Sequence, residues 1–178
     1  NFDTGPFIGV AVKHGNACGA AFDFQDPLAA IVKMVDGDPS AVFGGSVVTN
    51  FPITEEMAHM LRWREWRGDN PRPLDNVVAP SFSDDAVTEL ARKNGKCRLQ
   101  QNPALEVFRL RSIDKAEVRR PVRGGELHQD PNLFVPVFTD RDNPLLEQFG
   151  PKPTKPQIKD LLLAWAVSST SNSNTITL

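Results

Sequence analysis

A lysine–histidine pair near the start of the chain has the side chains needed to move a proton and to stabilise an anion. Lys13 and His14 follow the apolar run 7–12 and precede a glycine-punctuated segment over 15–19. A histidine exchanges protons near neutral pH, and an adjacent lysine supplies a fixed positive charge for a developing anion. The apolar run predicts a short buried strand, so the pair falls where a strand ends and a polar loop begins. In open α/β sheets, ligands bind at such carboxyl ends of strands.

The first half of the chain alternates between helix and strand signals. A helix is predicted where Asp26 can cap the first turn and Pro27 takes the first position, and it ends at Gly37. Further helices are predicted over 54–66 and from Ser83 to the stop at 94–95, with strands over 46–49, 76–79 and 97–99. This alternation predicts an α/β fold with a largely parallel or mixed sheet covered by helices.

The second half of the chain has a different pattern. Residues 107–129 contain strand segments with a turn at 124–125, and residues 139–156 are rich in proline and charge, which is typical of loops. A helix with an apolar stripe is predicted from Pro156. A polar stretch over 168–174 then leads to a predicted final strand at 175–178.

Length and composition are those of one ordinary globular domain. The chain has 178 residues, of which 40% are hydrophobic and 24% charged. A net charge of −2 argues against a general affinity for nucleic acid or an anionic membrane. Its two cysteines, Cys18 and Cys97, lack the spacing of a zinc knuckle or disulfide framework, which favours reduced thiols in a cytoplasmic protein. No apolar stretch approaches the roughly 20 residues of a membrane span, and no signal peptide opens the chain.

Several short segments, in order along the chain, resemble motifs of the AICAR transformylase family. Residues 13–19 resemble its KHxNPCG signature, and residues 38–45 resemble its DPxSAFGG element. Further matching segments are 77–80, 92–94, 124–130, 160–165 and 173–174, and Asn50 also falls at a matching place. The resemblance identifies residues 1–178 as a single domain that forms the first half of an AICAR transformylase domain. Since the chain lacks an initiator Met and stops abruptly, we expect a fragment or trimmed form.

The resemblance implies a fold and a reaction. The expected fold is a three-layer α/β/α arrangement with a mixed sheet, similar to cytidine deaminase. The expected reaction moves a formyl group from the co-substrate 10-formyltetrahydrofolate to the 5-amino group of AICAR, giving FAICAR, with no metal required. A homodimer with sites near the subunit interface is also expected, with AICAR and a reduced folate as ligands and neither nucleic acid nor membrane as a partner.

The resemblance also assigns roles to residues. By position, His14 is the base, Lys13 is the cationic stabiliser, and Asn174 hydrogen-bonds the substrate carboxamide. The residues expected to bind the nucleotide are Phe43 and Gly44, where backbone approaches the ligand, Asp75 at the ring or ribose, and Lys93 at the 5′-phosphate.

Two departures and several alternatives accompany this interpretation. The motif's proline is Ala17, and the family's second half, with its folate pocket, is not present in this sequence. We therefore expect another segment or subunit to complete the site. The main alternative is a non-catalytic module that binds a purine nucleotide or folate. A zinc deaminase would need a PCxxC motif that the chain lacks. The aromatic and basic residues 62–67 are open to two interpretations, a nucleic-acid-binding surface or an ordinary exposed helix face. His59 and His128 are expected to be structural.

Overall fold

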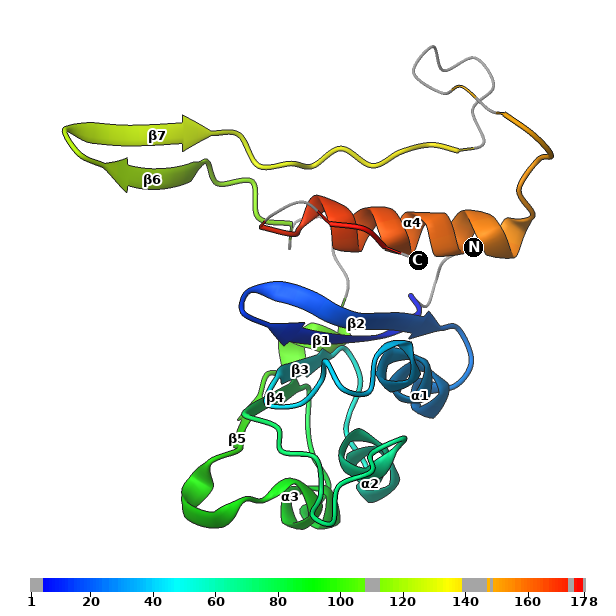
Figure 1. The fold of residues 1–178 in the computed structure, drawn as a ribbon, viewed down its shortest axis with the longest axis vertical. Coiled ribbons are helices and arrows are strands. Elements are labelled where there is room, and N and C mark those ends of the chain that lie inside the picture. The colour runs from blue at the N-terminus through cyan, green and yellow to red at the C-terminus, as the bar shows by residue number, and fades with distance from the viewer. Residues whose placement is uncertain (1–4, 108–112, 139–146, 148, 173–174, 178) are drawn as a thin grey trace. The chain divides into compact units, whose positions relative to one another are not determined.

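The structure is a computed structural model that describes residues 5–107, 113–138, 147, 149–172 and 175–177. Contacts divide the chain into two compact units, which we call unit 1 (Asn1–Phe108) and unit 2 (Arg109–Leu178). Figure 1 shows the elements of each unit. The single domain over 1–178 stays a prediction.

Unit 1 contains a mixed five-stranded sheet, which confirms the predicted sheet type. The strands are β1 (Phe7–Lys13), β2 (Asn16–Asp23), β3 (Ser46–Thr49), β4 (Asn76–Ala79) and β5 (Arg98–Gln101), in the order β2-β1-β3-β4-β5. β1 is antiparallel to β2 and β3, whereas β3, β4 and β5 run parallel. The α/β fold predicted from the alternating pattern is therefore present.

Strand β2 was not expected, because Gly15 and Gly19 make this segment resemble a loop in the sequence. Lys13 pairs with Asn16, so His14 and Gly15 alone form the turn, with φ values of 54° and 80°. Two successive residues with positive φ match the twist of a tight hairpin. Gly19 lies within β2. A Cβ at this position would come within 2.6 Å of the Met34 carbonyl oxygen, so the close approach of the helix that carries Met34 requires a glycine here. The glycine therefore serves close packing on a helix.

Three helices of unit 1 begin within one residue of the starts that the sequence predicts. They are α1 (Pro27–Gly37), α2 (Glu55–Trp63) and α3 (Asp84–Leu90), capped by the side chains of Asp26, Thr54 and Ser83. Two of them are shorter than predicted. The helix over 54–66 ends at Trp63, because Arg64 leaves the helical region and Glu65 has a φ of 51°. The stop at 94–95 belongs instead to a separate 3-10 helix, η1 (Lys93–Gly95).

The core of unit 1 lies between the sheet and these helices. Buried residues alternate along the strands and pair in register, as Ala11 does with Val47 and Val47 with Val77. They therefore share one face of the sheet. Helix α1 packs on β1 and β2, and α2 packs between α1 and α3. In Figure 1 the three helices lie on the same side of the sheet, so unit 1 itself has two layers.

Unit 2 consists of a hairpin and a helix. The hairpin is β6 (Val118–Val122) and β7 (Gly125–Gln129), and the helix is α4 (Lys155–Ser169), which Thr154 and Gln157 cap reciprocally. A 3-10 helix, η2 (Pro103–Glu106), ends the described part of unit 1. Residues 175–177 form no strand, contrary to the prediction for 175–178. Within the described ranges, no helix has both the length and the apolar character that a membrane span requires.

Candidate functional site

The lysine–histidine pair follows the carboxyl end of β1, but this is the edge of the sheet at which the parallel strands begin. Because β1 is antiparallel to β3, with Val12 opposite Ser46, the carboxyl end of β1 meets the amino ends of β3, β4 and β5. The carboxyl ends of the parallel strands lie at the opposite edge of the sheet, and a ligand site at the pair stays a prediction. The loops that enter β3 and β4 border the pair instead.

Lys13 is held by contacts to Phe43, thirty residues further along. Its Nζ donates a hydrogen bond to the Phe43 carbonyl oxygen at 2.8 Å and lies 5.7 Å from the centroid of the Phe43 ring. One N–H bond of the ammonium group is thus engaged by a carbonyl, and the cation also faces a π system. The arrangement fixes a positive charge at the end of β1.

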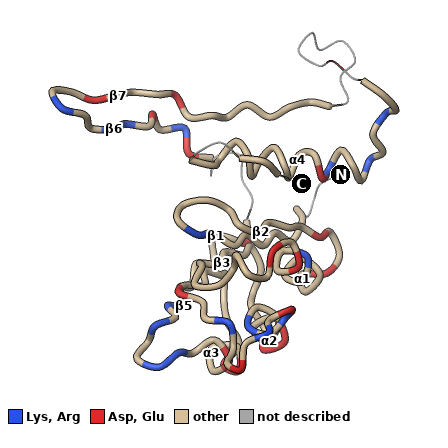
Figure 2. The backbone as a smooth tube through the Cα atoms, in the orientation of Figure 1, with Lys and Arg blue, Asp and Glu red and all other residues tan. Residues whose placement is uncertain are grey.

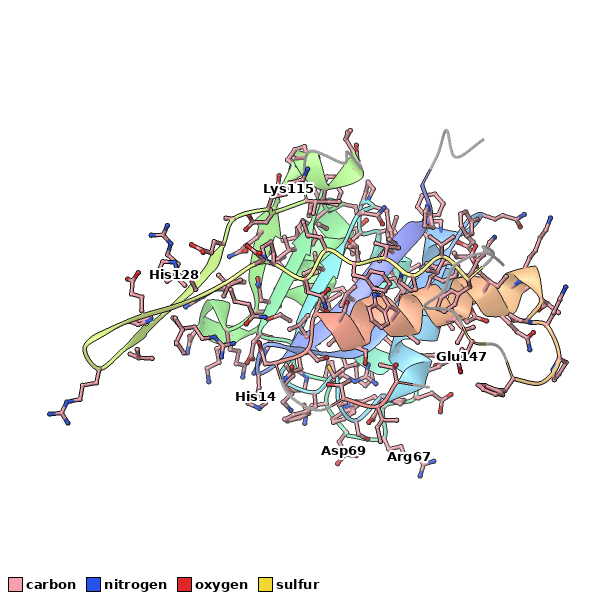
Figure 3. All side chains as sticks on the ribbon, turned by 90° about the horizontal axis from the view of Figure 1, so that it is seen from above. His14, Arg67, Asp69, Lys115, His128 and Glu147 are labelled. Carbon is pink, nitrogen blue, oxygen red and sulfur yellow. The ribbon has the colours of Figure 1, made fainter. Side chains whose placement is uncertain are left out.

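His14 occupies the tip of the β1–β2 hairpin. Its side chain is exposed and its φ of 54° lies in the left-handed region, where histidine is one of the more tolerated non-glycine residues. Figure 3 labels His14 near the end of the blue strands of unit 1. The ring is therefore accessible to a ligand that approaches Lys13 from solvent.

The loop Phe43–Gly44–Gly45 joins the pair to the entry of β4. The Gly44 amide donates to the Pro73 carbonyl oxygen at 2.9 Å, and the Gly45 carbonyl accepts from the Asp75 amide at 3.0 Å. A Cβ on Gly44, whose φ is +66°, would meet nothing within 4 Å. Open space therefore lies beside the backbone at Gly44, as the predicted close approach of a ligand requires.

Asp75 lies immediately before β4, where the sequence places it, and its side chain is 63% exposed. Arg92 pairs with it, since Nη1 lies 3.0 Å from Asp75 Oδ1 and donates to the Leu74 carbonyl oxygen at 2.9 Å. Sequence reasoning missed Arg92, although it begins the matched segment 92–94. No sequence signal marked it, because the helix predicted from Ser83 to the stop at 94–95 included Arg92.

The remaining predicted residues are less closely linked. Lys93 is exposed in η1, next to Arg92 in the chain. Figure 2 shows that basic residues follow one another along the segment that joins α3 to β5. Asn174 lies outside the described residues. The structure therefore brings together Lys13, Phe43, Gly44 and Asp75 by direct or backbone contacts, with His14 adjacent to Lys13.

Sequence reasoning also missed Trp66, which stacks on Phe43, and Arg72, which lies against Trp66. The Trp66 ring stacks on that of Phe43 with centroids 5.6 Å apart, and the Arg72 guanidinium carbon lies 5.4 Å from the Trp66 ring. The sequence placed residues 62–67 on one helix, but Trp66 lies beyond the end of α2. Its aromatic face is thus turned to the site loop rather than to a regular helical surface.

The other histidines and the cysteines have structural contacts. His59 lies 3.7 Å from a Glu89 carboxylate oxygen, and His128 lies 2.7 Å from one of Glu117. Both cysteines are free thiols. Burial raises the pKa of each cysteine, so the neutral thiol is favoured.

Comparisons with known proteins place these features in a family. Three relatives are each called a bifunctional purine biosynthesis protein PurH. They come from Caldicellulosiruptor saccharolyticus (30% identical), Dictyostelium discoideum (31%) and Anoxybacillus flavithermus (32%), and each match covers 95% of this chain. The chain spans only 29% or 30% of the length of these relatives. The family model of the AICARFT/IMPCHase bienzyme matches residues 1–178, and the chain therefore belongs to this family.

Proposed function

We propose that this chain contributes to purine biosynthesis by formyl transfer from 10-formyltetrahydrofolate to the 5-amino group of AICAR, giving FAICAR. The family description names two activities, and the Lys13–His14 pair supports this one. The observation that carries the proposal is the 2.8 Å hydrogen bond from Lys13 to Phe43, in a loop joined to Asp75. This contact supports the proposal because it links a cation, next to a histidine, to the loop whose Gly45 carbonyl oxygen accepts from the Asp75 amide.

The reaction needs both members of the pair. The amine of AICAR is a weak nucleophile, since its lone pair is delocalised towards the carboxamide. As its nitrogen attacks the formyl carbon, His14 takes the proton that the amine loses. Lys13 stabilises the oxyanion of the tetrahedral intermediate. Collapse of that intermediate breaks the bond to the folate nitrogen, which leaves with the proton that His14 returns to it.

The same edge of unit 1 supplies groups for the nucleotide. Asp75 would accept hydrogen bonds from the ring or ribose, and the backbone at Gly44 would lie against the ligand. Lys93, within the basic segment that follows α3, would meet the 5′-phosphate. Arg92 orients the Asp75 carboxylate through their 3.0 Å contact. Asn174 is the proposed partner of the carboxamide.

Further parts of the proposal concern what completes the site. We propose a homodimer in the cytoplasm and a three-layer, cytidine-deaminase-like domain, with a third layer over the half-buried sheet face that carries Val10 and Val48. Because the chain spans under a third of its relatives' length, the folate pocket is assigned to a further segment or subunit.

A formyl-transfer assay on the full-length protein tests the base role. His14→Ala should lower kcat by about 10²- to 10⁴-fold, the range that a positioned general base supplies. His59→Ala is the matched control, because His59 is also exposed but lies on α2, 3.7 Å from a Glu89 carboxylate oxygen on α3. Near-normal turnover of His14→Ala would refute the base assignment.

Calorimetric titration with AICAR separates the enzyme from a binding module. Asp75→Asn should weaken AICAR binding by about tenfold, the effect of losing a charge-assisted hydrogen bond. Binding with no formyl transfer by the full-length wild type would favour the non-catalytic module. A folded protein that does not bind AICAR would overturn the nucleotide site itself.

A further inference from the structure

The loop between α2 and β4 is built around the indole of Trp66. The indole Nε1 donates to the Asn70 carbonyl oxygen at 2.7 Å. A Cβ on Gly68 would lie 2.6 Å from that same nitrogen, so only glycine lets the backbone pass there. The backbone thus closes on the edge of the ring and restricts its orientation.

Arg72 holds the same indole from inside unit 1. Its side chain is fully buried, and its guanidinium donates to the carbonyl oxygens of Leu61 at 2.7 Å and Arg64 at 2.6 Å. These carbonyls belong to the last turn of α2 and its cap, where a cation is favourable. The side-chain hydrogen bonds described for Arg72 go to carbonyl oxygens and none to a carboxylate. The group is therefore anchored by the helix end while it also faces the Trp66 ring.

A continuous line of contacts runs from this anchor to the reacting edge. Arg72 faces Trp66, Trp66 stacks on Phe43, and Phe43 contacts Lys13 through both its ring and its carbonyl oxygen. We propose that Trp66, anchored by Arg72, is a positioning residue that fixes Phe43 and through it the ammonium group of Lys13. The consequence for turnover rests on the proposed function, whereas the positioning of Lys13 does not.

Phe43 and Lys13 need a further residue to hold them in place, because each is free to move by itself. Phe43 is 45% exposed and lies in a turn, and Lys13 has four rotatable side-chain bonds. Neither residue alone defines where the ammonium group sits. A displacement of about 1 Å in a group that stabilises a transition state can cost about 10²-fold in rate. Stacking on a ring that the fold already holds removes that freedom.

The kinetic test compares three variants of the full-length protein. Trp66→Leu should lower kcat by about tenfold or more, with a smaller rise in the KM for AICAR, because Lys13 acts on the developing charge. Trp66→Phe keeps an aromatic face and should restore most of the loss. Trp63→Leu is the control, because the contacts described for the Trp63 indole are to Glu89 and His59 and do not include Phe43.

A second measurement needs no turnover. The ammonium 1H–15N signal of Lys13, assigned by its loss in Lys13→Arg, should be visible in the wild type because the hydrogen bond to Phe43 slows exchange. It should persist in Trp66→Phe and Trp63→Leu and vanish in Trp66→Leu. Circular dichroism confirms that each variant is folded.

The outcomes distinguish the two proposals. An unchanged Lys13 signal in folded Trp66→Leu, or its absence from the wild type, would overturn the positioning role. If the signal behaves as expected but the wild type neither binds nor formylates AICAR, the proposed function fails and the positioning role stands.

Discussion

The two units differ in how much of their apolar surface they bury. Unit 1 encloses a cluster of buried apolar residues between its sheet and α1, α2 and α3. Among the described residues of unit 2 none is buried, and every residue of β6 and β7 is exposed. The residues proposed to bind and react in the described structure all lie in unit 1. A packed unit can hold side chains in place, whereas a hairpin and one helix have little internal packing with which to do so.

The largest expected contrast is in native-state hydrogen exchange. Amides of β3 and β4 should exchange only through global opening, which typically costs about 5–15 kcal/mol. Amides of β6 and β7 should exchange through local opening at about 0–2 kcal/mol, because no buried side chain secures the hairpin. Protection of β7 equal to that of β3 would show that the units do not differ in stability.

Deleting an apolar side chain should affect the two units very differently. Leu61→Ala should lower the free energy of unfolding by about 2–5 kcal/mol, because Leu61 is fully buried and its loss leaves a cavity. Leu127→Ala should change it by about 0.5 kcal/mol or less, since Leu127 in β7 is 59% exposed. Urea denaturation measures both, and similar losses would contradict the contrast in burial.

Adding a methyl group to a strand glycine should lower stability in unit 1 but not in unit 2. Gly19→Ala should lower the free energy of unfolding by about 1–3 kcal/mol, since its Cβ would lie 2.6 Å from the Met34 carbonyl oxygen. Gly125→Ala in β7 is the matched variant, because a Cβ there would meet nothing within 4 Å. Its thermal midpoint should stay near that of the wild type. Equal tolerance at both positions would mean that α1 does not pack on β2 as described.

The smallest effect concerns acid stability. The hydrogen bond from Lys33, with those from the Gln25 and Asp26 amides, holds the pKa of Asp23 well below its usual range. The ionised carboxylate therefore stabilises unit 1 above the unfolded-state pKa of about 3.9, and this contribution is lost as pH falls further. Asp23→Asn should make the decline in unfolding free energy below about pH 4 shallower.

The control for this pH dependence is Asp114→Asn in unit 2. Asp114 accepts a hydrogen bond from the Ala116 amide at 2.8 Å, a similar local contact. The Asp114→Asn variant should leave the acid unfolding of unit 1 unchanged. Urea titrations repeated at several pH values measure this. A slope altered by Asp114→Asn and not by Asp23→Asn would reverse the assignment.

Much of unit 1 is predictable because its local signals agree with its packing. The caps Asp26, Thr54 and Ser83 mark the starts of three helices, and each accepts the backbone hydrogen bond expected of a cap. Gly19 of β2 was misinterpreted, because a glycine that allows a helix to pack closely looks the same in sequence as one in a flexible loop. Distinguishing them requires knowing that Met34 lies opposite Gly19.

The site was predictable in part for the same reason. Residues next to strand ends, such as Lys13 and Asp75, could be placed from the strands themselves. Trp66 and Arg72 could not, because their roles depend on where α2 ends and on how the following loop folds back. The chain leaves the helical region at Arg64, and no glycine or proline at that position marks the end of the helix in the sequence.

The hairpin turn at His14 and Gly15 also limits how this chain can change in length. With only these residues between the paired Lys13 and Asn16, one inserted residue has no loop to absorb it. A shift of β2 by one position would turn its side chains to the opposite face, moving Gly19 away from α1 and placing a larger neighbour against Met34. Insertions and deletions in related sequences should therefore avoid this turn and accumulate elsewhere, for example near the exposed turn between β6 and β7.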